Sequence, residues 1–249
     1  MTLDAHQTGR VLRLTLNRPE KRNALNAALC LDLVRAIQTA NDDPSVGAIL
    51  LTANGPSFCA GMDLSEIGVA SSAQLDEAHE QLFTLGARLT KPLIAAVDGP
   101  ALGGGTGLVA NCHIVVASEQ ATFGLTEIRL GLWPFLVYRA CSAAMGDRRT
   151  LDLALTGRIF PAVEAHSLGL VHEVAPPARA VEIADALAAA SPTAIRNGMS
   201  FVQQVRDRGW TEAGEVARLI RGEVFESADF REGIQAFREK RKPIWPSLG

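Results

Sequence analysis

The chain has 249 residues, of which 47% are hydrophobic and 20% charged, a composition typical of a soluble globular protein with a large core. The net charge of −3 argues against general binding to nucleic acid, which needs a basic surface. The four cysteines are far apart and have no metal-binding spacing, so we expect buried thiols in a reducing compartment. No apolar leader and no membrane-length apolar run are present, which makes the cytoplasm the expected location and a membrane partner unexpected.

Strand and helix patterns alternate over the first part of the chain. Residues 11–19 alternate apolar and polar side chains and end at a proline, which predicts a strand. Leucine or isoleucine recurs every fourth residue in 23–40, which predicts one buried helix face. The following predicted segments are, in chain order, a strand at 46–54, a helix at 73–89, and strands at 91–100, 113–118 and 121–127. This alternation is typical of an α/β fold.

The pattern changes after about residue 140 and becomes almost wholly helical. One exception is "VHEVAP" at 171–176, which predicts a strand. Ser191 and Pro192 then begin a helix-rich tail. We therefore expect an α/β core over residues 1–190, which carries the site, and a helical region over 191–249.

Two glycine-containing loops stand out. The first is "SFCAGMD", in which Ala60 and Gly61 follow a predicted strand, and the second is "ALGGGTG" at 101–107. Glycines at such places either permit a tight turn and close packing or let bare backbone N–H groups approach a ligand. Two N–H groups that converge from different loops would form an oxyanion hole. Both explanations stay open at this point, whereas a nucleotide phosphate loop lacks its motif.

Six segments together resemble the crotonase (enoyl-CoA hydratase/isomerase) superfamily over nearly the whole chain. They are "NRPEKRNAL", "SFCAGMDLSEI", "PLIAAVDGPALGGGTGLVANCHIVVAS", "ATFGLTEIRLGL", "LDLALTGRIFPAVEAHSLGLVHEV" and "FREGIQAFREKRKPIW". The resemblance implies an α/β fold built as a spiral of ββα units. It also implies a helical C-terminal region that drives formation of a homotrimer or a dimer of trimers.

The resemblance further implies an acyl-CoA substrate whose enolate is held by the backbone N–H groups of Ala60 and Gly104. Glu127 matches a catalytic glutamate, and its apolar neighbours are expected to raise the pKa of its carboxyl group. Hydratases of this superfamily carry a second glutamate at the position occupied here by Gly107. We therefore favour one-base isomerisation of an enoyl-CoA. The alternatives are a hydratase that uses a different second acid, with Asp63, Glu66, His79 and Glu80 as candidates, or a weakly active protein that binds CoA esters.

The resemblance also implies a set of residues around the substrate. They are Arg22, Ala24, Gly61, Met62, Asp63, Gly103, Gly107, Trp133, Phe135 and Lys240. The bulky run at 133–137 is expected to wall the pocket against water, Lys240 is expected to reach the CoA of a neighbouring subunit, and Asp63 fits a helix cap as well as a substrate contact. CoA enters only as part of the substrate, so we expect no separate cofactor and no metal.

Overall fold

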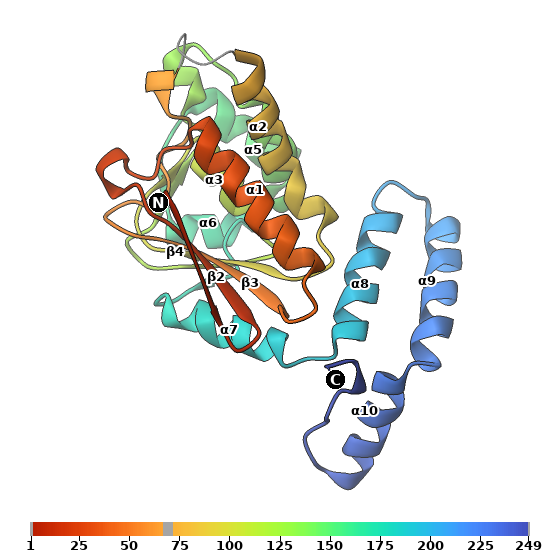
Figure 1. Ribbon diagram of the computed structural model, residues 1–249. Coiled ribbons are helices and arrows are strands. Elements are labelled where there is room, and N and C mark those ends of the chain that lie inside the picture. Colours follow the sequence, from red (N-terminus) through yellow and green to blue (C-terminus); the bar gives the residue numbers. More distant parts are fainter. Residues whose placement is uncertain (1, 67–71, 249) are drawn as a thin grey trace.

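The computed structural model describes residues 2–66 and 72–248 (Figure 1). Within these residues, one sheet has the strand order β1-β2-β3-β4-β6-β9, with β1 antiparallel to β2 and every other pair parallel. The strands are β1 (Leu3–Thr8), β2 (Val11–Leu16), β3 (Ala48–Ala53), β4 (Leu93–Val97), β6 (Ile114–Ala117) and β9 (Glu173–Val174). The predicted strands at 11–19, 46–54, 91–100, 113–118 and 171–176 all contain one of them, whereas β1 was not predicted.

Ten α-helices occur in the described ranges. They are α1 (Ala27–Asp42), α2 (Ser72–Leu85), α3 (Gly104–Ala110), α4 (Phe135–Met145), α5 (Asp147–Thr156), α6 (Ala162–Leu168), α7 (Ala178–Ala188), α8 (Pro192–Val205), α9 (Trp210–Phe225) and α10 (Ala228–Glu239). Helix α1 begins later than expected because Asn26 caps it, its side chain accepting a hydrogen bond from the backbone N–H of Leu29 at 3.0 Å. None of the described helices combines the length and apolar character needed to cross a membrane.

Helices cover both faces of the sheet, so its central strands are apolar on both sides. On β3, Ile49 and Leu51 join a large cluster with the buried faces of α1 and α2. The alternate residue Leu50 joins a second cluster with alanines of α7, which lies against the other face (Figure 1). Because successive side chains of a strand point to opposite faces of the sheet, β3 packs against α1 and α2 on one face and against α7 on the other.

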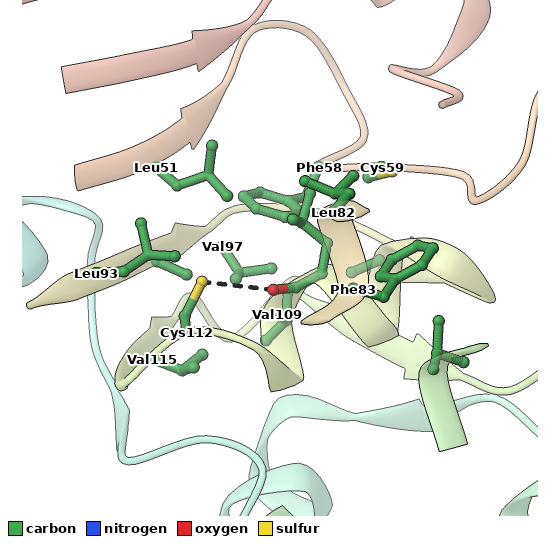
Figure 2. Close-up of a cluster of buried hydrophobic side chains, with 14 of the residues drawn as sticks. Leu51, Phe58, Cys59, Leu82, Phe83, Leu93, Val97, Val109, Cys112 and Val115 are labelled. Atoms are coloured by element: carbon green, nitrogen blue, oxygen red, sulfur yellow. Dashed lines mark hydrogen bonds between the residues drawn. The ribbon is translucent and has the colours of Figure 1, made fainter. Parts of the chain in front are cut away.

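The larger cluster is shown in Figure 2, where side chains from β3, β4 and α2 meet those of the chain between β5 and β6. Cys112 lies among them, and its thiol donates a weak hydrogen bond to the carbonyl oxygen of Leu108 at 3.4 Å. Burial raises the pKa of this thiol to about 12. All four cysteines are buried and free, as the sequence predicts.

A second, smaller sheet positions the glycine-rich segment. It contains β5 (Ala101–Leu102), β7 (Thr122–Gly124) and β8 (Phe160–Pro161), with β7 in the middle. The buried hydroxyl of Thr106 donates to the carbonyl oxygen of Ala101 at 2.7 Å and accepts from the N–H of Gly124 at 3.1 Å. This side chain therefore ties the start of α3 to the end of β7, directly ahead of Glu127.

The C-terminal helices α8, α9 and α10 extend away from the sheet layers (Figure 1). One polar contact to the core is made by Gln203 of α8, whose side chain donates to the carbonyl oxygen of Leu89 at 2.6 Å. Asp229 is buried and accepts hydrogen bonds from Ser191 at 2.6 Å and from the Ser247 hydroxyl at 2.7 Å. Asp229 thus holds the beginning of α8 and the end of the chain together.

Candidate active site

A cavity of about 410 Å³ lies where α2, α4 and the loops after β3 and β5 meet. Its lining is mostly apolar, and the charged residues among it are all acidic. The lining residues are Leu25, Ala60, Gly61, Met62, Leu64, Asp76, His79, Glu80, Phe83, Gly103, Gly104, Thr126, Glu127, Leu130, Leu132, Trp133, Pro134, Phe135, Leu136 and Val137. An apolar cavity with a few convergent polar groups is typical of a small-molecule site.

The glycines at 103–105 allow close packing of the backbone and also leave backbone N–H groups uncovered at the cavity. Gly105 is needed for packing, because a Cβ at this position would lie 2.2 Å from the carbonyl oxygen of Cys59. Gly103 has a φ of +54°, which favours glycine, and a Cβ here would lie 3.2 Å from Oε1 of Glu127. Gly104 is the first residue of α3, so its N–H has no acceptor within the helix. The bare backbone therefore faces the cavity at the point where Glu127 approaches.

The expectation that Ala60 supplies an N–H group to this site is wrong. Its N–H donates to the carbonyl oxygen of Arg22 at 3.0 Å and is therefore occupied. The hydrogen bonds of the next residues in this loop show which N–H group lacks an acceptor. The N–H of Leu25 donates to Gly61 at 2.7 Å, and the N–H of Asp63 donates to Leu25 at 2.9 Å.

These two bonds form a parallel bridge between Leu25 and Met62. In such a bridge the N–H and carbonyl of the middle residue, here Met62, point away from the partner. No described backbone or side-chain group accepts from the N–H of Met62. Gly61, with a φ of +91°, lies so close to the glycine stretch that a Cβ on it would be 3.2 Å from the nitrogen of Gly104. Met62 and Gly104 thus each carry a backbone N–H group that has no acceptor among the described residues, and they lie on two neighbouring loops that line the cavity.

Glu127 opens the short 3₁₀ turn that follows β7, Glu127–Leu130. Its Oε2 is buried and has no hydrogen-bond partner among the described residues. Burial raises the pKa of this carboxyl group above its ordinary value, and its own backbone N–H opposes the shift only partly. A buried carboxyl group with a raised pKa suits a group that takes and returns a proton near neutral pH.

Gly107 does not contact the cavity, contrary to the expectation from the resemblance. It is buried in α3, and a Cβ on it would lie 2.2 Å from Cγ1 and 2.4 Å from Cβ of Val137 in α4. Val137 itself lines the cavity. The valine side chain therefore fills the space into which a side chain at position 107 would extend.

Asp63, predicted as a substrate contact, does not line the cavity, and its carboxylate is held by contacts within the protein. Its carboxylate accepts from the N–H of Ser65 at 3.1 Å, from the Ser65 hydroxyl at 2.6 Å, and from the guanidinium of Arg18 at 2.9 Å. The hydrogen bond from the Ser65 hydroxyl is the largest of the effects that lower the pKa of Asp63. Asp63 thus caps the turn Leu64–Glu66, and in doing so holds the loop that carries Met62.

The remaining predicted residues fall into two groups. Trp133 and Phe135 line the cavity, and Phe135 is 73% exposed at its rim. Ala24 and Arg22 lie behind the Ala60 loop, where Ala24 is buried and Arg22 has an exposed side chain. Lys240 ends α10 in the exposed tail and does not line the cavity. Its predicted role concerns a neighbouring subunit and stays a prediction.

Helix α2 contributes four lining residues, of which His79 and Glu80 were candidates for a second acid and Asp76 and Phe83 were not predicted. Asp76, His79, Glu80 and Phe83 follow helical spacing and face the cavity. His79 is 6% exposed and its Nε2 has no partner in the described ranges. No cluster of three or more His, Cys, Asp or Glu able to hold a metal ion occurs among residues 2–66 and 72–248.

The chain is similar to known proteins over nearly its whole length. The family model "Enoyl-CoA hydratase/isomerase" matches residues 6–247. The chain is 38% identical to a putative enoyl-CoA hydratase of Thermus thermophilus, over 95% of this chain and 98% of the other. It is 36% identical to the 2,3-dehydroadipyl-CoA hydratase of Escherichia coli, over 94% of each chain.

A solved structure of enoyl-CoA hydratase from Mycobacterium smegmatis superposes with a TM-score of 0.92 at 31% identity, over 98% of this chain and 99% of that one. The human enoyl-CoA hydratase domain-containing protein 3 gives a TM-score of 0.93 at 28% identity, over 98% of this chain and 100% of that one. The α/β fold with its helical C-terminal region is therefore the crotonase fold, and the chain belongs to the enoyl-CoA hydratase/isomerase family.

Proposed function

We propose that this protein is an enzyme that moves the double bond of an enoyl-CoA thioester from the 3- to the 2-position. The observation that carries the proposal is Glu127, a buried carboxyl group without a partner in a cavity that also receives the N–H groups of Met62 and Gly104. The family match and the names of its relatives support a CoA thioester as substrate. CoA is part of that substrate, and the proposed reaction needs no separate cofactor.

The two backbone N–H groups would bind the thioester carbonyl oxygen. When a proton leaves C2, negative charge moves onto this oxygen, and the two donors stabilise it more strongly than they stabilise the neutral carbonyl. Loss of one such donor from an oxyanion hole costs about 2.7–4 kcal/mol of transition-state stabilisation. Both donors belong to the backbone of glycine-containing turns, so they are held in place before the substrate arrives.

Glu127 would carry out both proton transfers. Its carboxylate removes a proton from C2 of the 3-enoyl thioester. The electron pair of that C–H bond becomes the C1=C2 bond of a dienolate, while the carbonyl π electrons move onto the thioester oxygen and the C3=C4 bond stays in place. The protonated Glu127 then returns the proton to C4. On this protonation, the C3=C4 electrons form the new bond from C4 to hydrogen, the C1=C2 electrons become the C2=C3 bond, and the thioester carbonyl re-forms as the charge leaves its oxygen. One proton moves from C2 to C4, and no water is added.

The surroundings of Gly107 favour this one-base reaction. Hydration at the same cavity would need a second group to take a proton from water. No carboxyl group projects from position 107, and Val137 fills the space beside it. The wall of Leu132, Trp133 and Val137 also limits the room for water in this part of the cavity.

The proposal predicts a pH dependence as well as an activity. Wild-type protein should convert 3-hexenoyl-CoA to 2-hexenoyl-CoA, followed by chromatographic retention at unchanged mass. Because the base must be ionised, kcat/KM for isomerisation should rise with pH through the pKa of Glu127, which lies above the ordinary value of 4.5. Binding of the thioester without any turnover would contradict the proposal and would indicate a CoA-ester-binding protein.

We also propose that the tail helices form contacts between copies in a trimer or a pair of trimers, as the resemblance implies. Trp210, Phe237 and Ile244 are 97%, 84% and 80% exposed in the single chain. Contacts between copies would bury these side chains, and apolar groups that gather into one patch are typical of an interface. Lys240 would then reach the CoA of a neighbouring copy, while Arg22 would lie near the CoA of its own. Light scattering should give the mass of three or six chains, and a monomer at micromolar concentration would contradict this.

A further inference from the structure

Arg18 contacts both sides of the bridge between Leu25 and Met62, although it does not line the cavity. One nitrogen of its guanidinium donates to the carbonyl oxygen of Ala24 at 2.5 Å, and another donates to the carboxylate of Asp63 at 2.9 Å. Ala24 directly precedes Leu25 in the chain. Asp63 directly follows Met62. A single planar side chain therefore joins the two backbone segments that form the bridge.

The backbone of Arg18 is itself fixed by Asn23. The N–H of Arg18 donates to the side-chain oxygen of Asn23 at 2.7 Å, and the N–H of Asn23 donates to the carbonyl oxygen of Arg18 at 2.9 Å. Asn23 is fully buried, and both it and Arg22 are left-handed, with φ values of +55° and +50°. Residues other than glycine seldom adopt this conformation, which persists only where the surrounding contacts determine the backbone. The guanidinium of Arg18 thus extends from a rigid segment.

The ion pair between Arg18 and Asp63 is shielded from solvent, because the two side chains are only 12% and 7% exposed. The Ser65 hydroxyl and, less strongly, the guanidinium of Arg18 lower the pKa of Asp63, which keeps its carboxylate ionised at neutral pH. An exposed ion pair has little strength, whereas a pair with little water around it attracts more strongly. This pair can therefore hold the loop after β3 at a fixed distance from Arg18.

The same loop has other ties, which do not pass through Arg18. The N–H of Ala27 donates to the carboxylate of Glu66 at 2.9 Å, and this bond joins the loop to the first residue of α1. Asp63 also accepts from the N–H of Ser65 at 3.1 Å and from its hydroxyl at 2.6 Å. Loss of the Arg18 side chain should therefore shift the loop and leave the fold in place.

We propose that Arg18 is a positioning residue of this site, whose guanidinium fixes the direction of the Met62 N–H relative to that of Gly104. Arg18 would not touch the substrate, because it does not line the cavity. It acts through Ala24 and Asp63, on either side of the bridge. The inference rests on the proposed function in that the two N–H groups must bind the thioester oxygen.

Removal of Arg18 should weaken the transition state more than the bound substrate, because the thioester oxygen carries more charge in the enolate. A misplacement of about 1 Å at a catalytic group can lower a rate about 10²-fold. Arg18→Met should therefore lower kcat for isomerisation about 10²-fold and leave KM for 3-hexenoyl-CoA little changed. Arg18→Lys should recover part of the rate, since its ammonium can still pair with Asp63.

A spectroscopic experiment tests the N–H groups without the proton transfers of the reaction. Acetoacetyl-CoA ionises at C2 to an enolate that absorbs in the near ultraviolet, and a site that stabilises the thioester oxygen favours this enolate. Wild-type protein should form it at lower pH than free acetoacetyl-CoA does. In Arg18→Met the ionisation constant should be about 10²-fold smaller, which raises the midpoint by about two pH units. Calorimetric titration with hexanoyl-CoA should give similar affinities for both proteins.

Arg10→Met is the matched control. The guanidinium of Arg10 likewise joins distant backbone segments, donating to the carbonyl oxygens of Pro44 at 3.0 Å and Ala188 at 3.3 Å, and Arg10 does not line the cavity. This control should leave the enolate titration unchanged. The double variant Arg18→Met, Asp63→Asn no longer carries an unpaired carboxylate, so it should be more stable than Arg18→Met and still show the displaced midpoint.

Several results would overturn the inference. They are an enolate midpoint in Arg18→Met equal to that of wild type, an equal displacement in Arg10→Met, a midpoint restored in the more stable double variant, and an equal loss of hexanoyl-CoA affinity, which would make Arg18 structural. If Arg18→Met does not fold, the midpoint of Arg18→Lys decides in the same way. A displacement confined to the Arg18 variants, in a protein that does not isomerise 3-hexenoyl-CoA, would support the inference and contradict the proposed isomerase. Absence of an enolate signal in wild type would overturn the inference together with the N–H site.

Discussion

Glu127→Gln is expected to lower isomerisation by at least about 10²–10⁴, because both proton transfers of the proposed reaction pass through this carboxyl group. The amide keeps the shape of the side chain but cannot take up a proton from C2. Binding should persist, since the N–H donors of Met62 and Gly104 are unchanged. Initial rates on both hexenoyl-CoA isomers, together with calorimetric titration of hexanoyl-CoA, would check this. Wild-type rates in the variant would contradict the assignment of Glu127.

The same substitution should not cost stability at neutral pH. The pKa of Glu127 is raised in the folded state, so the folded protein binds more protons than the unfolded chain between the ordinary value of 4.5 and the folded pKa. Wild-type stability should therefore fall as pH rises through this window, and that decrease should be absent from Glu127→Gln. Urea unfolding midpoints at about pH 4 and pH 8 would show it. A variant that is less stable than wild type at pH 8 would mean that Glu127 has a structural partner.

Substitutions at the contact between Gly107 and Val137 should have a large effect on stability. Gly107→Glu alone should lose about 1–3 kcal/mol by overpacking, because its Cβ would meet both Cγ1 and Cβ of Val137 at 2.2 and 2.4 Å. Val137→Ala keeps that Cβ and would not relieve the clash, so the partner substitution is Val137→Gly. The double variant Gly107→Glu, Val137→Gly should recover most of the stability lost by Gly107→Glu.

The double variant should also hydrate 2-hexenoyl-CoA faster than wild type, since a second carboxyl group then reaches the cavity. Val137→Gly alone is the control for the extra space and for the cost of a helical glycine, about 1 kcal/mol. If Gly107→Glu alone is as stable as wild type, the contact with Val137 does not restrict this position.

Hydrophobic periodicity was sufficient to predict the buried strands and helices, but not the exposed edge strand or the exact ends of helices. Strands such as β3, with its continuous apolar run, were predicted because burial on both faces leaves a signal in the sequence. Strand β1 is mostly exposed and polar, and its pairing with β2 stabilises it. The expected helix start at Asn23 was wrong because that residue is left-handed and buried, and its side chain donates to the carbonyl oxygens of Asn54 and Ser57.

The candidate site likewise has features that the sequence predicts and features that only the structure shows. The glycines alone left packing and ligand access both open, and the resemblance predicted that the loop at 57–63 meets the loop at 101–107, where the structure has a bridge between Cys59 and Ala101. The choice between Ala60 and Met62 depends on hydrogen bonds between residues far apart in the chain: the N–H of Ala60 is bonded to the carbonyl oxygen of Arg22, whereas the N–H of Met62 points away from Leu25. The sequence likewise shows that Gly107 lacks a carboxyl group, but only packing reveals that Val137 fills the space. Of the four candidates for a second acid, His79 and Glu80 line the cavity and Asp63 and Glu66 do not, which depends on how α2 packs and cannot be seen in the sequence.

The bridge between Leu25 and Met62 has a consequence for how this protein can change over evolutionary time. The donor at position 62 is a peptide N–H, so nearly any amino acid there supplies it, and only proline removes it. The side chain of Met62 lines the cavity without being required for the donor. Position 62 is therefore free to vary in size and polarity and to retune which acyl groups fit, while the polarising group remains intact. Substitution of this one residue can therefore change which acyl groups bind without removing the backbone N–H group.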